Sequence, residues 1–264
     1  MPVRSTIAAV LISATALASA QAADLPARAY TKAAAVDPAY NWSGFYIGVN
    51  AGYGSGTSST SLTPDALEAI RVLPGQNPLP PNLHPDGFVG GGQAGYNDQF
   101  GSVVAGLEAD LSYANLRKTD SATGPFSIGG VLTTQIATRL DWFGTVRARL
   151  GVLPASNFLL YATGGLAYGN VRTTTTGSNL PAVNCTQTFI YCAAGSTSGV
   201  SVGWTAGAGM EYAFSREWTA RAEYLYLDLG NRSVTFPDIN APGMLTAVTS
   251  FRAHIVRGGL NYRF

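Results

Sequence analysis

The sequence has little charge and, after its first two dozen residues, no long apolar segment. Charged residues make up 12% of the chain and the formal net charge is +1, which excludes a basic nucleic-acid binder and an acidic disordered chain. No later run approaches the roughly 18 apolar residues of a membrane-spanning helix. Only two histidines and two cysteines are present, and neither histidine is near the cysteines in the sequence, so we expect no metal site and no cofactor.

Glycine and aromatic residues are abundant instead. The chain has 31 Gly, 13 Tyr and 11 Phe, and 46% of its residues are hydrophobic. A membrane protein without an apolar helix must satisfy its backbone hydrogen bonds in a closed sheet, because hydrocarbon offers no partners. A secreted β-sandwich is the competing interpretation of such a composition.

The N-terminus has the order of a secretory signal peptide. Arg4 precedes an apolar stretch from Ile7 to Leu17, and small residues follow, with Ala20 and Ala22 at the spacing of a cleavage site. We expect residues 1–22 to be the signal peptide. Residues 23–42 contain two prolines and an alanine run without strand alternation, which predicts a flexible periplasmic linker. A barrel domain is expected over residues 43–264.

Eight segments of the barrel domain alternate between apolar and polar side chains, the pattern of strands with one face in an apolar medium. In residues 103–113, Leu107, Ala109 and Leu111 alternate with Glu108 and Asp110. The predicted strands cover residues 43–55, 87–97, 103–113, 137–152, 158–170, 199–214, 218–228 and 256–264.

The links between these strands alternate in length. Residues 98–102, 153–157 and 215–217 form short links, whereas 56–86, 115–136, 171–198 and 229–248 form long ones. Outer-membrane barrels combine short periplasmic turns with long outer loops, and a sandwich does not sort its loops in this way. The sequence therefore predicts an all-β, eight-stranded antiparallel up-and-down transmembrane β-barrel. In the first long link, Thr63 and Pro64 predict the start of a short helix.

Three segments carry a family resemblance: Asn41–Gly48 followed by Gly52–Gly54, Arg221–Tyr226 with Asp228, and Val256–Phe264. They resemble the small outer-membrane β-barrel proteins of Gram-negative bacteria, of the OmpA-like and surface immunogenic porin type. The resemblance implies a cell outer membrane location, a structural or porin-like role and antigenic surface loops. It also implies that the barrel-assembly machinery reads the terminal residues Leu260, Tyr262 and Phe264. No peptidoglycan-binding domain follows the barrel in this sequence, so the tethering role of OmpA-like proteins is not expected.

The predicted lumen face carries charges of both signs. Side chains nearly fill the interior of an eight-stranded barrel. Because acidic and basic residues are equal in number there, the pattern favours ion pairs that plug the lumen over a narrow pore gated by these groups. We expect the inward glycines to leave space that water can occupy. The ten predicted lumen charges are Glu108, Asp110, Asp141, Arg147, Arg149, Glu211, Arg221, Glu223, Arg257 and Arg263.

The remaining reactive residues predict surface features. Cys185 and Cys192 lie close together in the third long link, which predicts a local disulfide in an exported protein. Ser250 and His254 lie roughly 13 Å apart along a strand, too far for a nucleophile and its base, so no enzyme is expected. Arg252 and His254 are instead expected to contact anionic lipid headgroups, with outer-membrane lipid and lipopolysaccharide as the partners and no nucleic acid.

Overall fold

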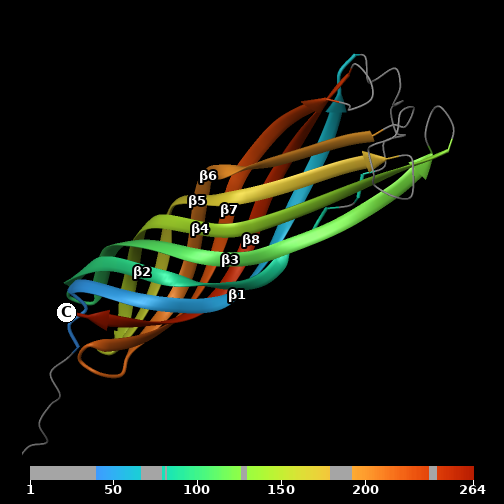
Figure 1. Ribbon diagram of the computed structural model, residues 1–264. Coiled ribbons are helices and arrows are strands. Elements are labelled where there is room, and N and C mark those ends of the chain that lie inside the picture. Colours follow the sequence, from blue (N-terminus) through green and yellow to red (C-terminus); the bar gives the residue numbers. More distant parts are fainter. Residues whose placement is uncertain (1–39, 67–78, 81, 126–129, 179–191, 238–242) are drawn as a thin grey trace, which may run out of the picture. The chain divides into compact units, whose positions relative to one another are not determined.

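The computed structural model describes residues 40–66, 79–80, 82–125, 130–178, 192–237 and 243–264. The described chain forms one closed barrel of eight antiparallel strands, each hydrogen-bonded to its neighbours in sequence (Figure 1). Pairing of the first strand with the last closes the ring, with Tyr46 opposite Arg263. The strands are β1 (Gly44–Pro64), β2 (Asp86–Phe100), β3 (Val103–Pro125), β4 (Val131–Ala155), β5 (Phe158–Ser178), β6 (Cys192–Ala213), β7 (Trp218–Pro237) and β8 (Met244–Arg263). The predicted eight-stranded up-and-down architecture is confirmed.

Short turns close one end of the barrel. Gly101 and Ser102 join β2 to β3, and Gly101 has a φ of 64°, a left-handed conformation that suits glycine in a two-residue hairpin. The C-terminus lies at this end beside the start of β1 (Figure 1). By the loop-length rule of outer-membrane barrels, this end faces the periplasm. No helix among the described residues is long and apolar enough to cross a membrane.

The strands are longer than the sequence predicts. Strand β3 continues to Pro125 and β4 begins at Val131, so most of the predicted link 115–136 is strand. The predicted helix start is also wrong, because Thr63 and Pro64 belong to β1, where Thr63 pairs with Thr246. The outer strand segments are rich in Thr and Ser, and Thr134 interrupts the buried apolar residues Leu132 and Ile136 on the inward face of β4, so hydrophobic alternation does not reveal them. Cross-strand hydroxyl contacts accompany the ladder there, such as Thr235 to Thr246 at 2.9 Å.

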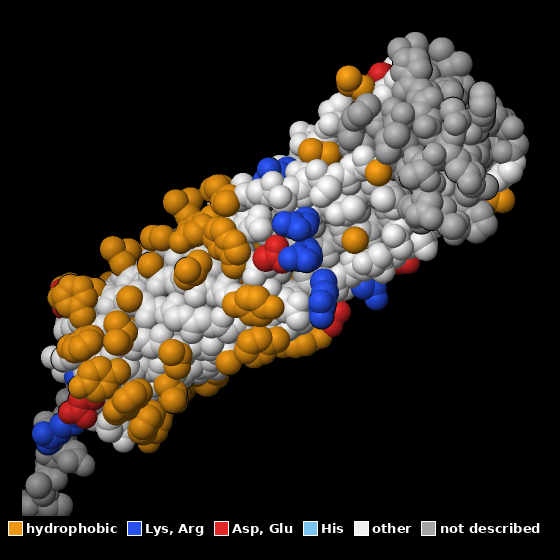
Figure 2. Space-filling model, in the orientation of Figure 1, with side chains coloured by type: hydrophobic (Ala, Val, Ile, Leu, Met, Phe, Trp, Pro, Cys, Tyr) orange, Lys and Arg blue, Asp and Glu red, His pale blue; other side chains and the backbone are white. Residues whose placement is uncertain are grey.

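Exposed apolar side chains are concentrated in the periplasmic half of the barrel, where Figure 2 shows an orange belt. On β3 the belt runs from Val103 to Tyr113, and on β4 it includes Val146, Leu150 and Val152. This length matches the 9–11 residues that a tilted strand needs to cross the membrane. Because β3 has 23 residues and β4 has 25, about half of each strand projects beyond the apolar belt.

The alternation of β4 slips at one bulge. Leu140 and Phe143 are both buried in the lumen, whereas Asp141 and Trp142 between them are not. The pairing of β4 with β5 shifts register between Leu140 and Phe143, as an inserted residue requires. The inward residues of β4 therefore change from even to odd positions at the bulge, with Leu140 before it and Phe143 and Arg147 after it.

Candidate functional site: the closed lumen

The periplasmic mouth is filled by the segment that precedes β1. Trp42 is 2% exposed, its backbone N–H donates to Gln99 Oε1 at 2.8 Å and its indole Nε1 donates to the Ser156 carbonyl at 3.0 Å. Tyr40 packs edge to face against Trp42, with ring centroids 4.8 Å apart. The predicted linker 23–42 is therefore wrong at its end, because residues 40–42 belong to the barrel. Its remainder and the predicted signal peptide lie outside the described residues.

A layer of charged side chains follows above this mouth. We call it the ionic layer: four carboxylates and four guanidiniums, all buried, from Glu108, Asp110, Arg147, Arg149, Glu211, Arg221, Glu223 and Arg257. Strand alternation directs them inward in pairs two residues apart, such as Glu108 with Asp110. The register also places acids opposite arginines on adjacent strands, as in Glu108 opposite Arg147 and Glu223 opposite Arg257.

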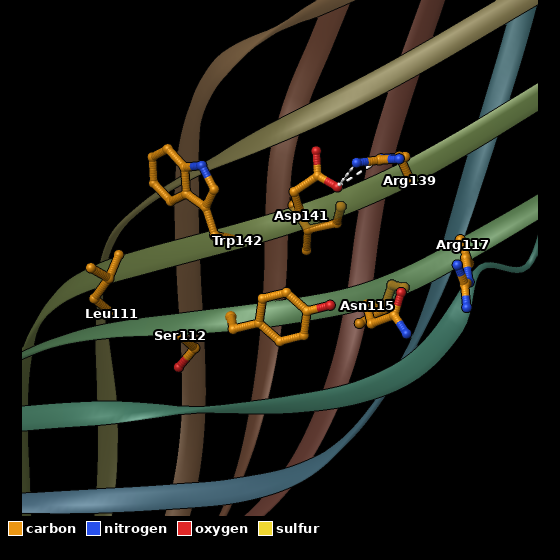
Figure 3. Close-up of a pocket in the computed structure, with 10 residues that line it drawn as sticks. Leu111, Ser112, Asn115, Arg117, Arg139, Asp141 and Trp142 are labelled. Carbon is orange, nitrogen blue, oxygen red and sulfur yellow. Dashed lines mark hydrogen bonds and ion pairs between the residues drawn. The ribbon is translucent and has the colours of Figure 1, made fainter.

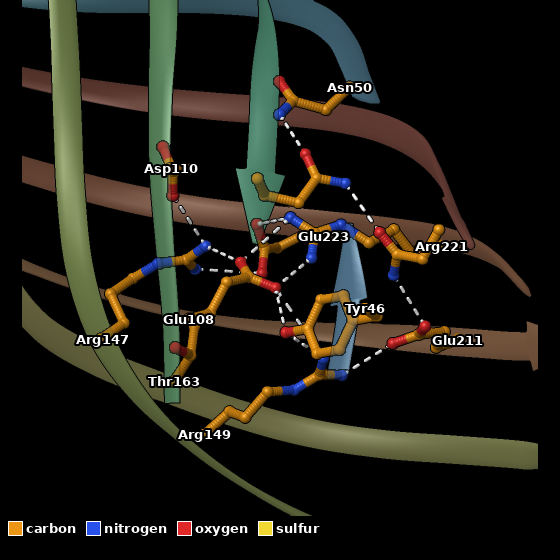
Figure 4. Close-up of polar contacts among 12 residues, drawn as sticks. Tyr46, Asn50, Glu108, Asp110, Arg147, Arg149, Thr163, Glu211, Arg221 and Glu223 are labelled. Atoms are coloured by element: carbon orange, nitrogen blue, oxygen red, sulfur yellow. Dashed lines mark hydrogen bonds and ion pairs between the residues drawn. The ribbon is translucent and has the colours of Figure 1, made fainter. Parts of the chain in front are cut away.

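Arg147 lies at the centre of the ionic layer. Its guanidinium pairs with Glu108, with Asp110 at 3.0 Å and with Glu223 at 3.0 Å. Glu108 also pairs with Arg221 Nη1 at 2.5 Å, and Glu223 pairs with Arg257 Nη2 at 2.7 Å. The contacts of Arg147 and Arg221 join strands β3, β4 and β7 across the lumen (Figure 4), and the pair of Glu223 with Arg257 adds β8. Each carboxylate in this group is thus shared by at least two arginines.

Aromatic and amide side chains extend the network to the other strands. Tyr46 donates its hydroxyl hydrogen to Glu108 at 2.6 Å and accepts from Arg149 Nη1 at 3.0 Å (Figure 4). Arg149 Nη2 donates to Glu211 at 2.7 Å, and its guanidinium lies 4.1 Å from the ring centre of Tyr161. A chain of amides completes the layer: Asn50 donates to Gln93, Gln93 to Asn261 and Asn261 to Glu211.

Charge balance makes this burial tolerable. A buried charge without a partner costs several kcal/mol, whereas multiple hydrogen bonds to each ion offset much of the desolvation cost. The network sets four negative charges against four positive ones, and each of the eight side chains makes at least one ion pair. Moving any one charge therefore breaks ion pairs of its buried neighbours, so the ionic layer resists opening.

Two of the ten predicted lumen charges lie elsewhere. Asp141 is on the outer wall, where its Oδ1 pairs with Arg139 Nη2 at 2.6 Å. The prediction for Asp141 is wrong because the β4 bulge reverses parity between it and Arg147. Arg263 is at the periplasmic mouth, with its guanidinium 4.3 Å from the ring centre of Tyr40 and no carboxylate partner among the described residues.

Inward glycines do not leave open space. A Cβ at Gly95 would collide with the phenol of Tyr46, and one at Gly52 would lie 2.7 Å from Arg257 Cβ. A Cβ at Gly209 would lie 2.6 Å from Tyr161 Cζ. The expectation of water-filled gaps at the glycines is therefore wrong at these positions, because their missing side chains make room for the large residues of the ionic layer.

A second closed layer, which the sequence interpretation missed, lies on the outer side of the ionic layer. We call it the apolar layer, and strands β2, β3, β4, β5, β7 and β8 contribute to it. A cavity beside Val171 and Phe251 measures about 10 Å³, close to the smallest that holds one water molecule. The apolar layer comprises Val89, Ala114, Leu116, Leu140, Phe143, Ala167, Val171, Leu225, Leu227, Leu229, Phe251, Ala253 and Ile255.

The other predicted residues lie on the barrel wall or outside the described residues. Leu260 and Phe264 face outward near the periplasmic end, and the ring of Tyr262 packs 5.4 Å from that of Phe264. That the barrel-assembly machinery recognises Leu260, Tyr262 and Phe264 stays a prediction. Cys185 lies outside the described residues, so its disulfide with Cys192 also stays a prediction. His254 faces outward and its Nδ1 lies 2.6 Å from the hydroxyl of Tyr224.

Comparison with known proteins agrees with this architecture. A family model described as outer membrane protein beta-barrel domain matches residues 7–264. The chain is 38% identical over 235 residues to the 31 kDa outer-membrane immunogenic protein of Brucella melitensis, with 88% of this chain and 87% of that protein covered. It is 31% identical over 195 residues to the 22 kDa outer membrane protein of Rhizobium leguminosarum bv. viciae, with 74% and 68% covered.

Among solved structures, the outer membrane protein OprG from Pseudomonas aeruginosa has a TM-score of 0.52 at 13% identity, covering 86% of this chain and 100% of that one. At this identity the likeness supports the fold alone. Together with the closed eight-stranded ring and its apolar belt, the family match shows that the chain belongs to the outer membrane protein beta-barrel family and is a protein of the outer membrane.

Proposed function

We propose that this protein is a closed, non-enzymatic structural barrel of the outer membrane that presents its projecting half as a contact surface. The observation that carries the proposal is the presence of two closed layers in series within one lumen. The ionic layer blocks the passage of apolar solutes, and the apolar layer excludes ions and small polar solutes because they would lose their hydration. A solute must disrupt both layers to cross.

The main alternative is a narrow porin gated by the lumen charges. Such a pore requires the ionic layer to move aside, which breaks contacts such as Arg147 with Glu108, Asp110 and Glu223 together. Breaking one buried pair costs about 3–5 kcal/mol, so a state with several pairs broken is sparsely populated. Even then, Phe143, Phe251 and their neighbours still close the lumen.

The projecting half of the strands supports the surface role. Exposed polar side chains such as Ser198 on β6 and Ser233 on β7 lie beyond the apolar belt on continuous strands. In this half, β6 is paired with β5, as in Ser198 opposite Arg172, and β7 is paired with β8, as in Ser233 opposite Val248. The pairing of β6 with β7 ends at Trp204 opposite Asp228, so each of these two strands is held by one neighbour there. Two Brucella relatives of different size carry "immunogenic" in their names, which fits a protein whose outer half is accessible at the cell surface.

Solute entry into proteoliposomes tests the closed barrel. The protein is purified from outer membranes, its folding is verified by heat-dependent gel mobility, and liposome swelling is followed in small sugars and amino acids. We expect swelling rates equal to those of protein-free liposomes. Swelling that grows in proportion to the amount of folded protein would establish the porin instead.

A further inference from the structure

Three arginines stand side by side on the outer wall, just beyond the apolar belt. Arg117 on β3 is the register partner of Arg139 on β4, and Arg139 is the partner of Arg172 on β5. We call these residues the arginine row. All three are exposed. Directly opposite positions on antiparallel strands are about 5 Å apart, and like charges there destabilise the sheet unless another charge compensates them.

The protein itself supplies little compensation for the arginine row. Asp141 pairs with Arg139 at 2.6 Å. Asp86, which accepts a hydrogen bond from the Tyr53 hydroxyl, is the register partner of Arg117, so two carboxylates stand beside three guanidiniums. Within the described residues, neither Arg117 nor Arg172 forms an ion pair. The row therefore presents more positive charge than its carboxylate neighbours neutralise, which favours an anionic ligand.

An aromatic side chain lies below each arginine, toward the membrane. On β3, Tyr113 precedes Arg117 by four residues, and on β5, Tyr168 precedes Arg172 by four. Strand β4 runs in the opposite direction, toward the periplasm, so there Trp142 follows Arg139 by three residues. Trp142 and Tyr168 also pack together, with ring centroids 6.1 Å apart. Aromatic residues at this height mark the boundary between hydrocarbon and headgroups. The arginine row thus stands at headgroup level in the outer leaflet.

A groove of about 750 Å³ lies between β3 and β4 at this boundary. Its membrane end is lined by Leu111, Tyr113 and Trp142, and its outer end by Arg117, Arg139 and Asp141. Figure 3 shows Leu111 and Arg117 at opposite ends of the groove along β3, with Trp142, Asp141 and Arg139 following one another along β4. The pairing of β3 with β4 shifts register at this groove. The three residue steps from Tyr113 to Leu116 on β3 lie opposite the two steps from Trp142 to Leu140 on β4.

We propose that this groove binds a phosphorylated glycolipid of the outer leaflet, namely lipopolysaccharide. Arg117 and Arg139 hold a phosphate group between them, since a guanidinium makes paired, charge-assisted hydrogen bonds to phosphate oxygens. Arg172 approaches the same headgroup from the next strand. An acyl chain lies over Leu111, Tyr113 and Trp142, which gives the site its preference for a lipid over a free anion. The site depends on the outer-membrane location and not on whether the lumen conducts.

Binding of lipid A to the purified protein in detergent, measured as complex formation by native mass spectrometry, tests this site. We expect R117Q and R139Q each to weaken binding about tenfold, because each removes a charge-assisted contact. The variant R216Q is the control, since Arg216 is an exposed arginine in the β6–β7 turn at the periplasmic end of the barrel, away from the groove. We expect R216Q to bind as the wild type does.

Two further measurements distinguish binding of a lipid phosphate from binding of free phosphate. W142A is expected to weaken lipid A binding, and inorganic phosphate at the same concentration is not expected to displace lipid A. Displacement by inorganic phosphate would show an unspecific anion site and overturn the proposal. Equal binding by R117Q, R139Q and the wild type, or an equal loss in R216Q, would also overturn it. The substituted arginines are exposed and Trp142 is partly buried, and heat-dependent gel mobility verifies that each variant is folded.

Discussion

Tyr161 on β5 stands directly opposite Gly209 on β6, and its phenol ring fills the space that a side chain at position 209 would need. The ring in turn lies under the guanidinium of Arg149, and its hydroxyl donates to Glu223 at 3.1 Å. Glycine at position 209 is therefore a packing requirement of the ionic layer. The same relationship holds between Gly95 and Tyr46.

Substitution of Gly209 by alanine is expected to destabilise the barrel by about 1–3 kcal/mol, because the added Cβ overpacks the lumen. The measurement is the free energy of unfolding in urea from lipid vesicles. Gly258→Ala is the matched control, since a Cβ there meets its nearest atom, the Arg221 carbonyl oxygen, at an ordinary 3.7 Å. Equal stability of the Gly209→Ala and Gly258→Ala variants would show that the lumen has spare room.

Arg147→Ala removes the cation that Glu108, Asp110 and Glu223 share. We expect a loss of about 3–5 kcal/mol in unfolding free energy, because the three carboxylates are left buried with fewer partners. In the control Arg252→Ala, an exposed pair with Asp228 is lost, which costs at most about 1 kcal/mol. A similar small loss in both variants would contradict the ionic layer as a source of stability.

Trp42→Ala tests the closure of the periplasmic mouth. Truncation of a buried tryptophan costs about 3–5 kcal/mol, so we expect a lower urea midpoint of unfolding. Trp42→Phe keeps the packing but loses the hydrogen bond to Ser156, and it is expected to lose about 1 kcal/mol. An unchanged midpoint in Trp42→Ala would mean that this segment is a free arm, as the sequence alone suggests.

Cysteine labelling tests the orientation and the projecting strands. In a background with Cys185 and Cys192 replaced by serine, we expect Ser198→Cys and Ser233→Cys to react with a membrane-impermeant maleimide on intact cells. Ser215→Cys lies in the β6–β7 turn and is expected to react only after lysis. Labelling of position 215 on intact cells, or protection of positions 198 and 233, would contradict the assignment of the short-turn end to the periplasm.

The sequence predicts the membrane-spanning part of the fold well, because each strand has lipid on one face and the lumen on the other. Apolar and polar residues therefore alternate along it. Residues 103–113 show this directly, and their predicted inward acids Glu108 and Asp110 lie in the ionic layer. Beyond the membrane the outward face meets water, and threonines interrupt the apolar residues of the inward face, as Thr134 does between Leu132 and Ile136, so clear alternation does not mark the continuation of the strand. The outer parts of β3 and β4 were therefore predicted as a loop.

The sequence does not show which way a side chain faces beyond a bulge, nor which residues pair with one another in the lumen. One inserted residue between Leu140 and Phe143 turns Asp141 outward, and no local signal at Asp141 announces the bulge. By contrast, Leu225 and Leu227 continue the inward parity of Arg221 and Glu223, so the apolar layer had a signal. It was missed because the lumen face was expected to be polar throughout.

Single-channel conductance in planar bilayers tests the closed lumen most directly. The protein purified from outer membranes is compared with Glu108→Ala, which weakens the ionic layer, and Phe251→Ala, which opens the apolar layer. We expect all three to leave the bilayer silent, because in each single variant the other layer stays closed. Discrete conductance steps from the wild-type protein, enlarged by Glu108→Ala, would contradict the closed barrel and establish a pore gated by the lumen charges.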